Sequence, residues 1–259
     1  MTSSKRIGVL VSSKGNKLQA ILDACKEGRI SGRVVFVGSD NYQAYALERA
    51  RHHNIPWFVV DYTLMRQKYR QTPDKFELPN GFDLKEILAK QRLYLAEKKD
   101  TKEIVFLLKT RAIAEKQILQ KMAPYPFDLL VLAGFMRKLT PYFIEEVNRG
   151  FQPPRIMNMH ATLCPAFPGI DGYGQTLRYG CKVGGCTVHF VDYGVDSGPI
   201  VDQETFKIEP DDTFESVKQK GLQLECELYP KCIQLFAQKR LKIRKNEIGR
   251  LVVDILPEW

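Results

Sequence analysis

The sequence predicts an α/β protein with an open, mostly parallel, Rossmann-like sheet, helices on both faces and an antiparallel C-terminal extension. Two features of the chain lead to this prediction. Up to His160, short apolar runs alternate with amphipathic segments, as they do in successive βαβ units. Beyond that residue, the apolar runs become rich in β-branched residues and are joined by a turn rich in Gly and Asp, which is typical of antiparallel strands.

Five strands are expected in the parallel part of the sheet. Each is a short apolar run, which suits a strand that is buried on both faces. The runs cover Arg6–Ser12, Gly32–Gly38, Pro56–Asp61, Asp128–Gly134 and Arg155–His160. Helices are expected where apolar residues recur at helical spacing between these strands, namely at Leu18–Lys26, Tyr42–His53 and Pro141–Val147.

The C-terminal part of the chain is expected to extend the sheet and to cover it with one long helix. Gly184–Val191 and Pro199–Ile208 have the composition of antiparallel strands. The helix is predicted over Asp212–Leu235, with Asp211 or Asp212 as its N-cap. A terminal hairpin is predicted from two short runs around Asn246–Gly249, namely Leu241–Arg244 and Leu251–Asp254.

Residues 63–110 interrupt this alternation and are interpreted as an insertion at the edge of a single domain that covers 1–259. Pro73 and the run Pro79-Asn80-Gly81 break the first half of the segment. A charged helix is expected over Asp83–Lys99, followed by the very apolar run Ile104–Leu108. Because the segment is too short to bury a core of its own, we expect it to remain part of the main domain.

Composition restricts the class of protein. The chain has 259 residues, of which 44% are hydrophobic and 27% charged, as in soluble globular proteins rather than disordered or membrane proteins. Apolar runs such as Leu129–Phe135 are much shorter than the roughly 20 residues that span a bilayer. The N-terminal residues Met1–Arg6 are polar and give no sign of a signal peptide, so a cytoplasmic location is expected.

The net charge of +9 and the six cysteines also bear on function. Much of the basic excess lies in Thr63–Thr110 and Lys239–Arg250, where aromatic residues are not interleaved with the charges as they are in single-strand binding surfaces. We therefore expect solvated faces and anionic small substrates rather than nucleic acid. The cysteines form no CxxC pair and none lies near a histidine at ligand spacing, so neither a metal site nor a disulfide framework is expected.

The first candidate for chemistry is the loop Ser12–Lys17, which follows the first strand and enters a helix. In a doubly wound sheet this position binds phosphate-bearing ligands, because free backbone N–H groups and the helix dipole face the anion. The loop has neither the GxGxxG nor the Walker pattern, and a simple tight turn is an equally good interpretation. Lys17 either adds charge to a phosphate site or is merely solvated.

Two further candidates lie at the end of the fifth strand and in a turn after it. Strand alternation places Asn158 and His160 on one side of that strand, where an amide and an imidazole could stabilise an oxyanion and transfer a proton. For each residue a structural role is the alternative, and it is the favoured interpretation for His189. In the turn around Asp192 and Asp196, the carboxylates either orient a histidine or form local backbone bonds. The chain has no GxSxG motif, so a covalent acyl-enzyme is not expected.

Taken together, these segments resemble the formyl-folate transferase superfamily, and within it the glycinamide ribonucleotide transformylases (phosphoribosylglycinamide formyltransferases). The resemblance covers residues 5–61 and about 110–245, and its motifs occur in the family's order. The motifs are Gly15–Ala20, Leu132–Arg137, Asn158–His160 with Pro165–Gly169, Thr187–Val191 with Asp196–Pro199, and Glu225 with Leu228–Pro230.

The resemblance implies transfer of the formyl group of 10-formyltetrahydrofolate to the amine of glycinamide ribonucleotide in purine biosynthesis, by direct amine attack and without a metal. It implies catalytic roles for Asn158, His160 and Asp196. The phosphate loop of the family matches Gly15, Asn16 and Lys17, and a ribose-binding glutamate matches Glu225. Small-molecule substrates, no membrane and a monomer or homodimer are expected. The implied folate-binding residues are Arg111, Met136, Arg137, Lys138, Leu139, Asp192 and Val195.

Departures from the family pattern leave alternatives open. The family's Gly-x-Gly-Ser-Asn is Ser13-Lys14-Gly15-Asn16-Lys17 here, and Cys226 replaces a common histidine. A sugar-nucleotide N-formyltransferase is therefore one alternative, and an inactive paralogue with a binding role is another. Formyltetrahydrofolate deformylase shares the triad but normally carries a preceding regulatory domain. Methionyl-tRNA formyltransferase needs a C-terminal nucleic-acid-binding domain, which is not seen after Leu235.

Overall fold

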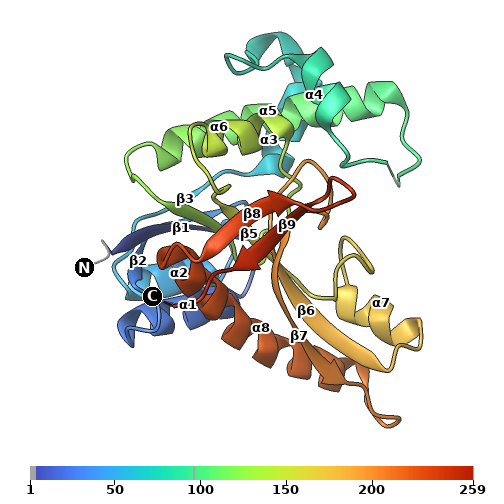
Figure 1. Cartoon of the computed structure of the whole chain (residues 1–259). Coiled ribbons are helices and arrows are strands. Elements are labelled where there is room, and N and C mark those ends of the chain that lie inside the picture. The colour runs from blue at the N-terminus through green and yellow to red at the C-terminus, as the bar shows by residue number, and fades with distance from the viewer. Residues whose placement is uncertain (1–3, 96, 259) are drawn as a thin grey trace.

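Seven strands form one sheet in the order β3-β2-β1-β4-β5-β6-β7 (Figure 1). The computed structural model describes residues 4–95 and 97–258. The first five strands are parallel, and β6 and β7 continue the sheet in antiparallel pairing, which confirms the predicted fold class. The strands are β1 (Lys5–Val11), β2 (Gly32–Ser39), β3 (Trp57–Val59), β4 (Leu129–Leu132), β5 (Ile156–His160), β6 (Val183–Phe190) and β7 (Ile200–Lys207).

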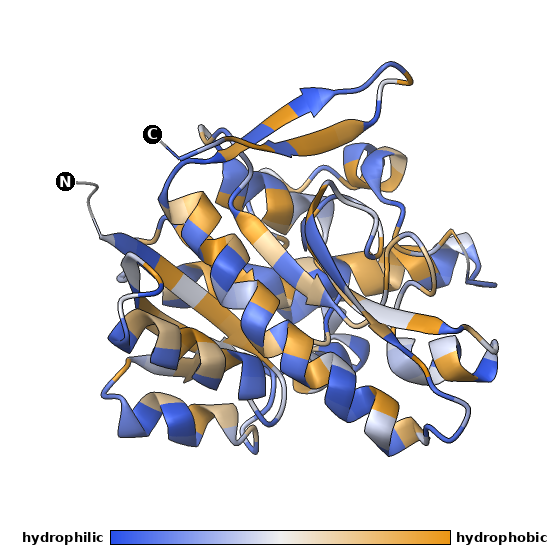
Figure 2. Ribbon diagram, turned by 60° about the horizontal axis from the view of Figure 1, so that its bottom comes forward, coloured by the Kyte–Doolittle hydropathy of each residue, from blue (hydrophilic) through white to orange (hydrophobic). Residues whose placement is uncertain are grey.

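Helices cover both faces of the sheet, as predicted (Figures 1 and 2). In β1, Ile7, Val9 and Val11 contribute to the core beneath one set of helices, whereas Leu10 contributes to the core beneath the other. This alternation explains why the strand is apolar throughout. The first set is α1 (Asn16–Lys26), α2 (Ala46–His52) and α8 (Phe214–Ala237); the second is α3 (Tyr62–Gln71), α5 (Thr101–Met122) and α6 (Pro141–Asn148).

The strand order reverses between β1 and β4, and this reversal determines where a ligand can bind. From β1 the chain proceeds outward through β2 and β3, then returns to the other side of β1 with β4. The loops that follow β1 and β4 therefore diverge at one edge, which is the usual ligand position in such sheets. Gly15 in the β1 loop has φ +74°, and a Cβ there would lie 2.7 Å from the Cβ of Ala46. Only glycine fits this turn without displacement.

The inserted segment differs from its prediction in two respects. Helix α4 (Leu84–Lys90) begins after the predicted Asp83 but ends well before Lys99, because Gln91 is already extended (φ −68°, ψ 140°); Ala96, within the predicted helix, lies outside the described residues. Helix α5 was not anticipated, although its buried residues Leu108, Ala112, Glu115 and Ile118 recur at helical spacing. It runs through the predicted boundary at residue 110, so the segment joins the main fold within a helix rather than in a loop.

Smaller differences from the prediction concern the helices. Helix α2 begins at Ala46 rather than near Tyr42, and the short helix α7 (Gly172–Arg178) was not predicted. The N-cap of α8 is Thr213, whose hydroxyl accepts from the Ser216 N–H at 3.2 Å while the Ser216 hydroxyl accepts from the Thr213 N–H at 2.9 Å. This reciprocal pair satisfies two amide groups at once, which the predicted aspartate caps do not. A short 3-10 turn spans Pro73–Lys75.

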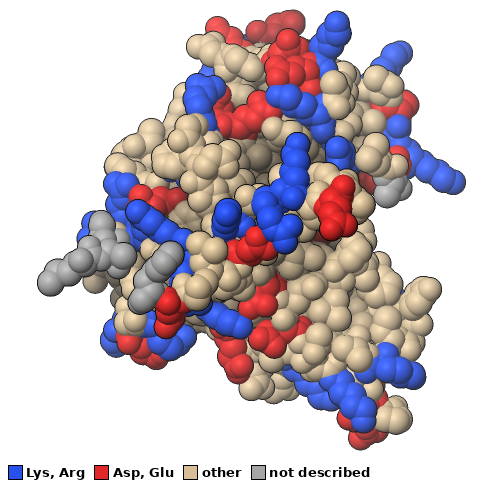
Figure 3. Space-filling model, viewed as in Figure 1, with Lys and Arg blue, Asp and Glu red and all other residues tan. Residues whose placement is uncertain are grey.

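The terminal hairpin was predicted correctly, as β8 (Leu241–Lys245) paired with β9 (Leu251–Ile255) in a sheet of its own. Its basic side chains Lys242, Arg244 and Lys245 are exposed, as expected for a solvated face. Acidic partners neutralise part of the charge; for example, the Asp254 carboxylate lies 2.6 Å from Arg244. Figure 3 shows basic and acidic side chains side by side on this face of the molecule. Within the described residues, we find no helix both long and apolar enough to cross a bilayer.

A buried tyrosine joins α8 to the two central strands, and this contact leads to a first prediction. Tyr229 is fully buried, and its hydroxyl lies within donating distance of two carbonyls, that of Leu132 at the end of β4 (3.1 Å) and that of Met157 near the start of β5 (2.8 Å). Tyr229→Phe should lower the free energy of unfolding by about 1–2 kcal/mol, because it leaves buried acceptors without this donor. Urea unfolding measures the loss, and Tyr42→Phe, at a 68% exposed position, is the control. Equal stability of both variants would contradict the role assigned to this hydroxyl.

Candidate active site

A cavity of about 190 Å³ lies at the edge of the sheet where β4 and β5 end. The loop after β4, the end of β5 and the loop that joins β6 to β7 supply most of its wall. Of the predicted catalytic and folate-binding residues, all except Arg111 line it: Met136, Arg137, Lys138, Leu139, Asn158, His160, Asp192, Val195 and Asp196. Segments far apart in the sequence therefore meet in one place.

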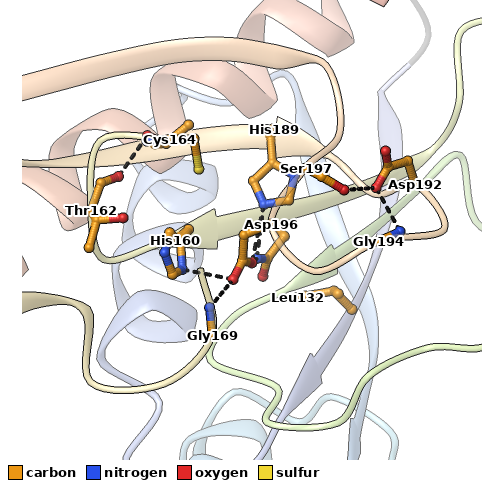
Figure 4. Close-up of polar contacts among 12 residues, drawn as sticks. Leu132, His160, Thr162, Cys164, Gly169, His189, Asp192, Gly194, Asp196 and Ser197 are labelled. Carbon is orange, nitrogen blue, oxygen red and sulfur yellow. Dashed lines mark hydrogen bonds and ion pairs between the residues drawn. The ribbon is translucent and has the colours of Figure 1, made fainter. Parts of the chain in front are cut away.

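The three predicted catalytic residues meet around the carboxylate of Asp196. Figure 4 shows His160 and Gly169 pointing toward this carboxylate. Asn158 and His160 project to the same side of β5, as the alternation predicted. The His160 Nδ1 lies 3.3 Å from Asp196 Oδ2, and the Asn158 amide donates to Asp196 Oδ1 at 3.3 Å. The Gly169 N–H also donates to Oδ2, at 2.8 Å. The carboxylate is thus surrounded by donors from β5 and from the loop at Gly169.

The turn that carries Asp196 holds this residue in an uncommon backbone conformation. Asp196 has φ +49°, in the left-handed region that aspartate and asparagine tolerate better than most residues. Asp192 stabilises the turn, because its Oδ1 accepts from the Gly194 N–H at 3.0 Å and from the Ser197 hydroxyl at 2.7 Å. Of the two interpretations of these carboxylates, local backbone bonding applies to Asp192, and orientation of a histidine applies to Asp196.

The surroundings of Asp196 keep its carboxylate charged. Burial by itself raises the pKa of Asp196, but the contact with His189, the positive charge available on His160 and the Gly169 N–H together outweigh burial. The net result is a pKa of Asp196 below its ordinary value. The carboxylate oxygen that lies 3.3 Å from His160 Nδ1 therefore stays negatively charged although it is buried.

His189 lies in this cluster, although the sequence favoured a purely structural role for it. In the antiparallel pairing of β5 with β6, it is directly opposite Asn158. Its Nδ1–H donates to the Phe190 carbonyl at 2.9 Å, and its Nε2 lies 3.2 Å from Asn158 Nδ2 and 3.6 Å from Asp196 Oδ1. The register of two antiparallel strands produces this contact, and no local pattern in the sequence encodes that register.

The loop after β1 is tied to helix α8 by a buried ion pair. The ammonium of Lys17 contacts the Glu225 carboxylate, 208 positions away in the sequence, and Glu225 is only 2% exposed. The Tyr173 hydroxyl donates to the same carboxylate at 2.9 Å. Lys17 also lies beside the main cavity, because its Cε would be 3.9 Å from a Cβ at Gly134. A polar region thus lies next to the cavity and is not part of its wall. It consists of Gly15, Asn16, Lys17 and Glu225.

Arg111 supports the cavity from behind. It is not among the lining residues; its Nη1 donates to the Lys138 carbonyl at 2.7 Å, and its guanidinium lies 5.8 Å from the centre of the Tyr94 ring. The charges of the two neighbouring cations also have partners: Arg137 pairs with Asp40, and the Lys138 ammonium donates to the Leu93 carbonyl at 2.8 Å. The folate-binding roles of these three residues stay predictions.

Comparison with known proteins identifies the family of this chain. A model of the formyl transferase family matches residues 5–233, which span the whole main sheet and most of α8. The chain belongs to this family. In the part of this formyl transferase that the structure describes, no group of three or more His, Cys, Asp and Glu side chains is arranged to hold a metal ion.

Relatives of this formyl transferase come from several bacteria. It is 30% identical over 242 residues to the phosphoribosylglycinamide formyltransferase of Haemophilus influenzae, covering 93% of this chain and 92% of the relative. The crystal structure of glycinamide ribonucleotide transformylase 1 from Symbiobacterium toebii is similar with a TM-score of 0.74 and 36% identity, covering 99% of this chain and 96% of that one. A formyltetrahydrofolate deformylase from Pseudomonas syringae, at 18% identity and a TM-score of 0.70, shares the fold; the alignment covers 98% of this chain and 66% of that one.

The contact between His189 and Asp196 leads to a second prediction. His189→Leu removes the imidazole and fills its space with an apolar side chain. The pKa of Asp196 should then rise, because one of the interactions that oppose the effect of burial is lost. NMR titration of the Asp196 carboxyl carbon measures the change. His53→Leu, at an exposed position, is the control and should leave this pKa unchanged. An unaltered Asp196 pKa in His189→Leu would mean that His189 does not influence the carboxylate.

Proposed function

We propose that this formyl transferase moves the formyl group of 10-formyltetrahydrofolate to the amine of glycinamide ribonucleotide in de novo purine biosynthesis. The observation that carries the proposal is the convergence of Asn158, His160 and Asp196 on one cavity at the carboxyl edge of the sheet. The names of the Haemophilus influenzae and Symbiobacterium toebii relatives support this acceptor. The chain acts as one domain, with residues 63–110 as an insertion.

The two substrates are assigned to adjoining parts of the site. The folate donor occupies the cavity lined by Met136–Leu139 and the turn Asp192–Asp196. The acceptor binds beside it, with its phosphate at the N-terminus of α1 near Gly15–Lys17, where the N–H groups and the helix dipole favour an anion. Glu225 binds the ribose hydroxyls. This arrangement brings the amine to the formyl carbon next to Asn158 and His160.

In the proposed mechanism, the amine attacks the formyl carbon directly, and a negatively charged oxygen develops on the tetrahedral intermediate. The Asn158 amide and protonated His160 donate hydrogen bonds to this oxygen. Both ring nitrogens of His160 face acceptors, Asp196 Oδ2 at 3.3 Å and the Phe167 carbonyl at 3.0 Å, which suits an imidazolium with two N–H groups. Donation from Nε2 to the substrate requires that this N–H leave the Phe167 carbonyl.

Asp196 has two tasks in this mechanism. Its carboxylate fixes the orientation of the His160 ring and stabilises the positive charge on it. It also helps to relay the proton that the attacking amine loses to the folate nitrogen that departs. A carboxylate whose pKa lies below its ordinary value remains ionised at neutral pH and can perform both tasks.

One assay tests the reaction as a whole. The purified protein is mixed with 10-formyltetrahydrofolate, with and without glycinamide ribonucleotide, and the folate product is measured. Product that forms only when the nucleotide is present supports the transfer. Product without it indicates a deformylase, and no product in either mixture indicates another acceptor, such as a sugar nucleotide, or an inactive paralogue.

Substitutions at the triad give a third prediction. His160→Ala should lower kcat by about 10²–10³ because it removes a donor to the oxyanion, while both substrates still bind. Asp196→Asn should cause a comparable loss and keep the backbone conformation, because asparagine also tolerates positive φ. Single-turnover kinetics with calorimetric binding separates the two effects, and His52→Ala, on the exposed end of α2, is the control. Normal turnover in either triad variant would refute the assigned roles.

The ion pair at the acceptor site gives a fourth prediction. Glu225→Gln should raise the KM for glycinamide ribonucleotide about tenfold or more, because the charged partner of Lys17 and of the ribose hydroxyls is lost. The KM for the folate should stay within twofold of the wild-type value. Glu227→Gln, at an exposed position on the same helix, is the matched control. If the folate KM rises instead, Glu225 belongs to the donor site.

A further inference from the structure

One turn of the inserted segment reaches the cavity. The turn comprises residues 91–95, directly after α4 (Figure 1). Leu93 lies among the residues that line the cavity, although the rest of the lining comes from the central strands and their loops. It is only 4% exposed and belongs to a small apolar cluster with Ile87, Leu108 and Tyr142. Val195, in the turn that carries Asp196, packs against the same cluster.

Two hydrogen bonds attach the 91–95 turn to the loops on either side of the cavity. The Arg92 N–H donates to the Tyr193 carbonyl at 2.8 Å, which joins the turn to the loop that carries Asp196. The Lys138 ammonium donates to the Leu93 carbonyl at 2.8 Å, which joins it to the loop after β4. Both bonds use backbone atoms of the turn, so they place its backbone rather than one mobile side chain.

Side chains around the turn strengthen this attachment. Glu145 of α6 accepts from Lys90 at 2.7 Å and from the Tyr193 hydroxyl at 2.8 Å, and so connects the end of α4 with the Asp192–Asp196 turn. The Lys138 ammonium lies 5.1 Å from the centre of the Tyr94 ring and pairs with Glu97. A helix as short as α4 is not stable alone, so these contacts determine the position of the 91–95 turn.

We propose that the 91–95 turn is a wall of the donor site and that Leu93 contacts the aromatic part of the bound folate. The inference rests on the proposed function, and it assigns a role to the inserted segment. The 91–95 turn also contacts Tyr193 and Val195, so it positions the loop that carries Asp196. The Lys138 ammonium binds the Leu93 carbonyl and Glu97, so this cation helps to hold the wall in place. Leu93 is thereby a determinant of donor affinity and not of acceptor affinity.

The test compares two leucine-sized side chains in the same cluster. Leu93→Ala should raise the KM for 10-formyltetrahydrofolate and the Kd for tetrahydrofolate about tenfold, since an apolar contact with the ligand is lost. The KM for glycinamide ribonucleotide should not change. Ile87→Ala is the matched control: Ile87 is also 4% exposed and in the same cluster but does not line the cavity, so both donor constants should stay at wild-type values.

The outcomes separate this inference from the proposed function. If folded Leu93→Ala binds tetrahydrofolate with wild-type affinity, the proposal that this turn is a wall of the donor site is overturned, even if formyl transfer is intact. An equal loss in Ile87→Ala also overturns it, because that loss reflects general loosening of the cluster. If Leu93→Ala does not fold, Leu93→Val removes one methylene, and its Kd should rise about threefold; an unchanged Kd again overturns the proposal. Failure of the wild-type protein to bind tetrahydrofolate refutes the proposed function, and this inference with it.

Discussion

Parallel pairing of β4 with both β1 and β5 places the carboxyl ends of three strands at one edge, and every part of the candidate site depends on that arrangement. The first turn of α1, which directly follows the β1 loop, supplies Lys17, the loop after β4 supplies Met136–Leu139, and β5 ends with Asn158 and His160. Because each strand is covered on both faces, slippage by one residue would move the side chains of one core into the other and disrupt the packing of both. Packing of the buried core therefore fixes the positions of the polar side chains at the carboxyl ends of these strands.

At this edge, a buried carboxylate is kept charged by the groups that also serve the proposed reaction. Burial disfavours the ionised form of Asp196, and donors from β5, β6 and the loop at Gly169 oppose that effect. Removing a single donor alters the balance for the whole cluster, since the interactions share one acceptor. His189, near the end of β6, belongs to this balance because its imidazole helps to lower the pKa of Asp196.

The inserted segment and the turn Asp192–Asp196 stabilise each other. The turn holds Asp196 at positive φ, a conformation that persists only when its surroundings enforce it. Asp192 provides part of that support from within the turn, and the Arg92 N–H together with Glu145 provides the rest from outside. These contacts fix the position of an inserted segment that has no core of its own, and they place its 91–95 turn against the cavity.

The sequence by itself determined the sheet with its antiparallel extension and the pair Asn158 and His160, because strand burial and the two-residue alternation are local properties. Only the tertiary structure decided which distant residues meet. The contact of His189 with Asn158 depends on the register between β5 and β6, and the place of Leu93 on the cavity depends on hydrogen bonds that cross between loops. The physical reason is that local patterns encode which face of an element is buried, whereas packing of whole elements decides what lies against that face.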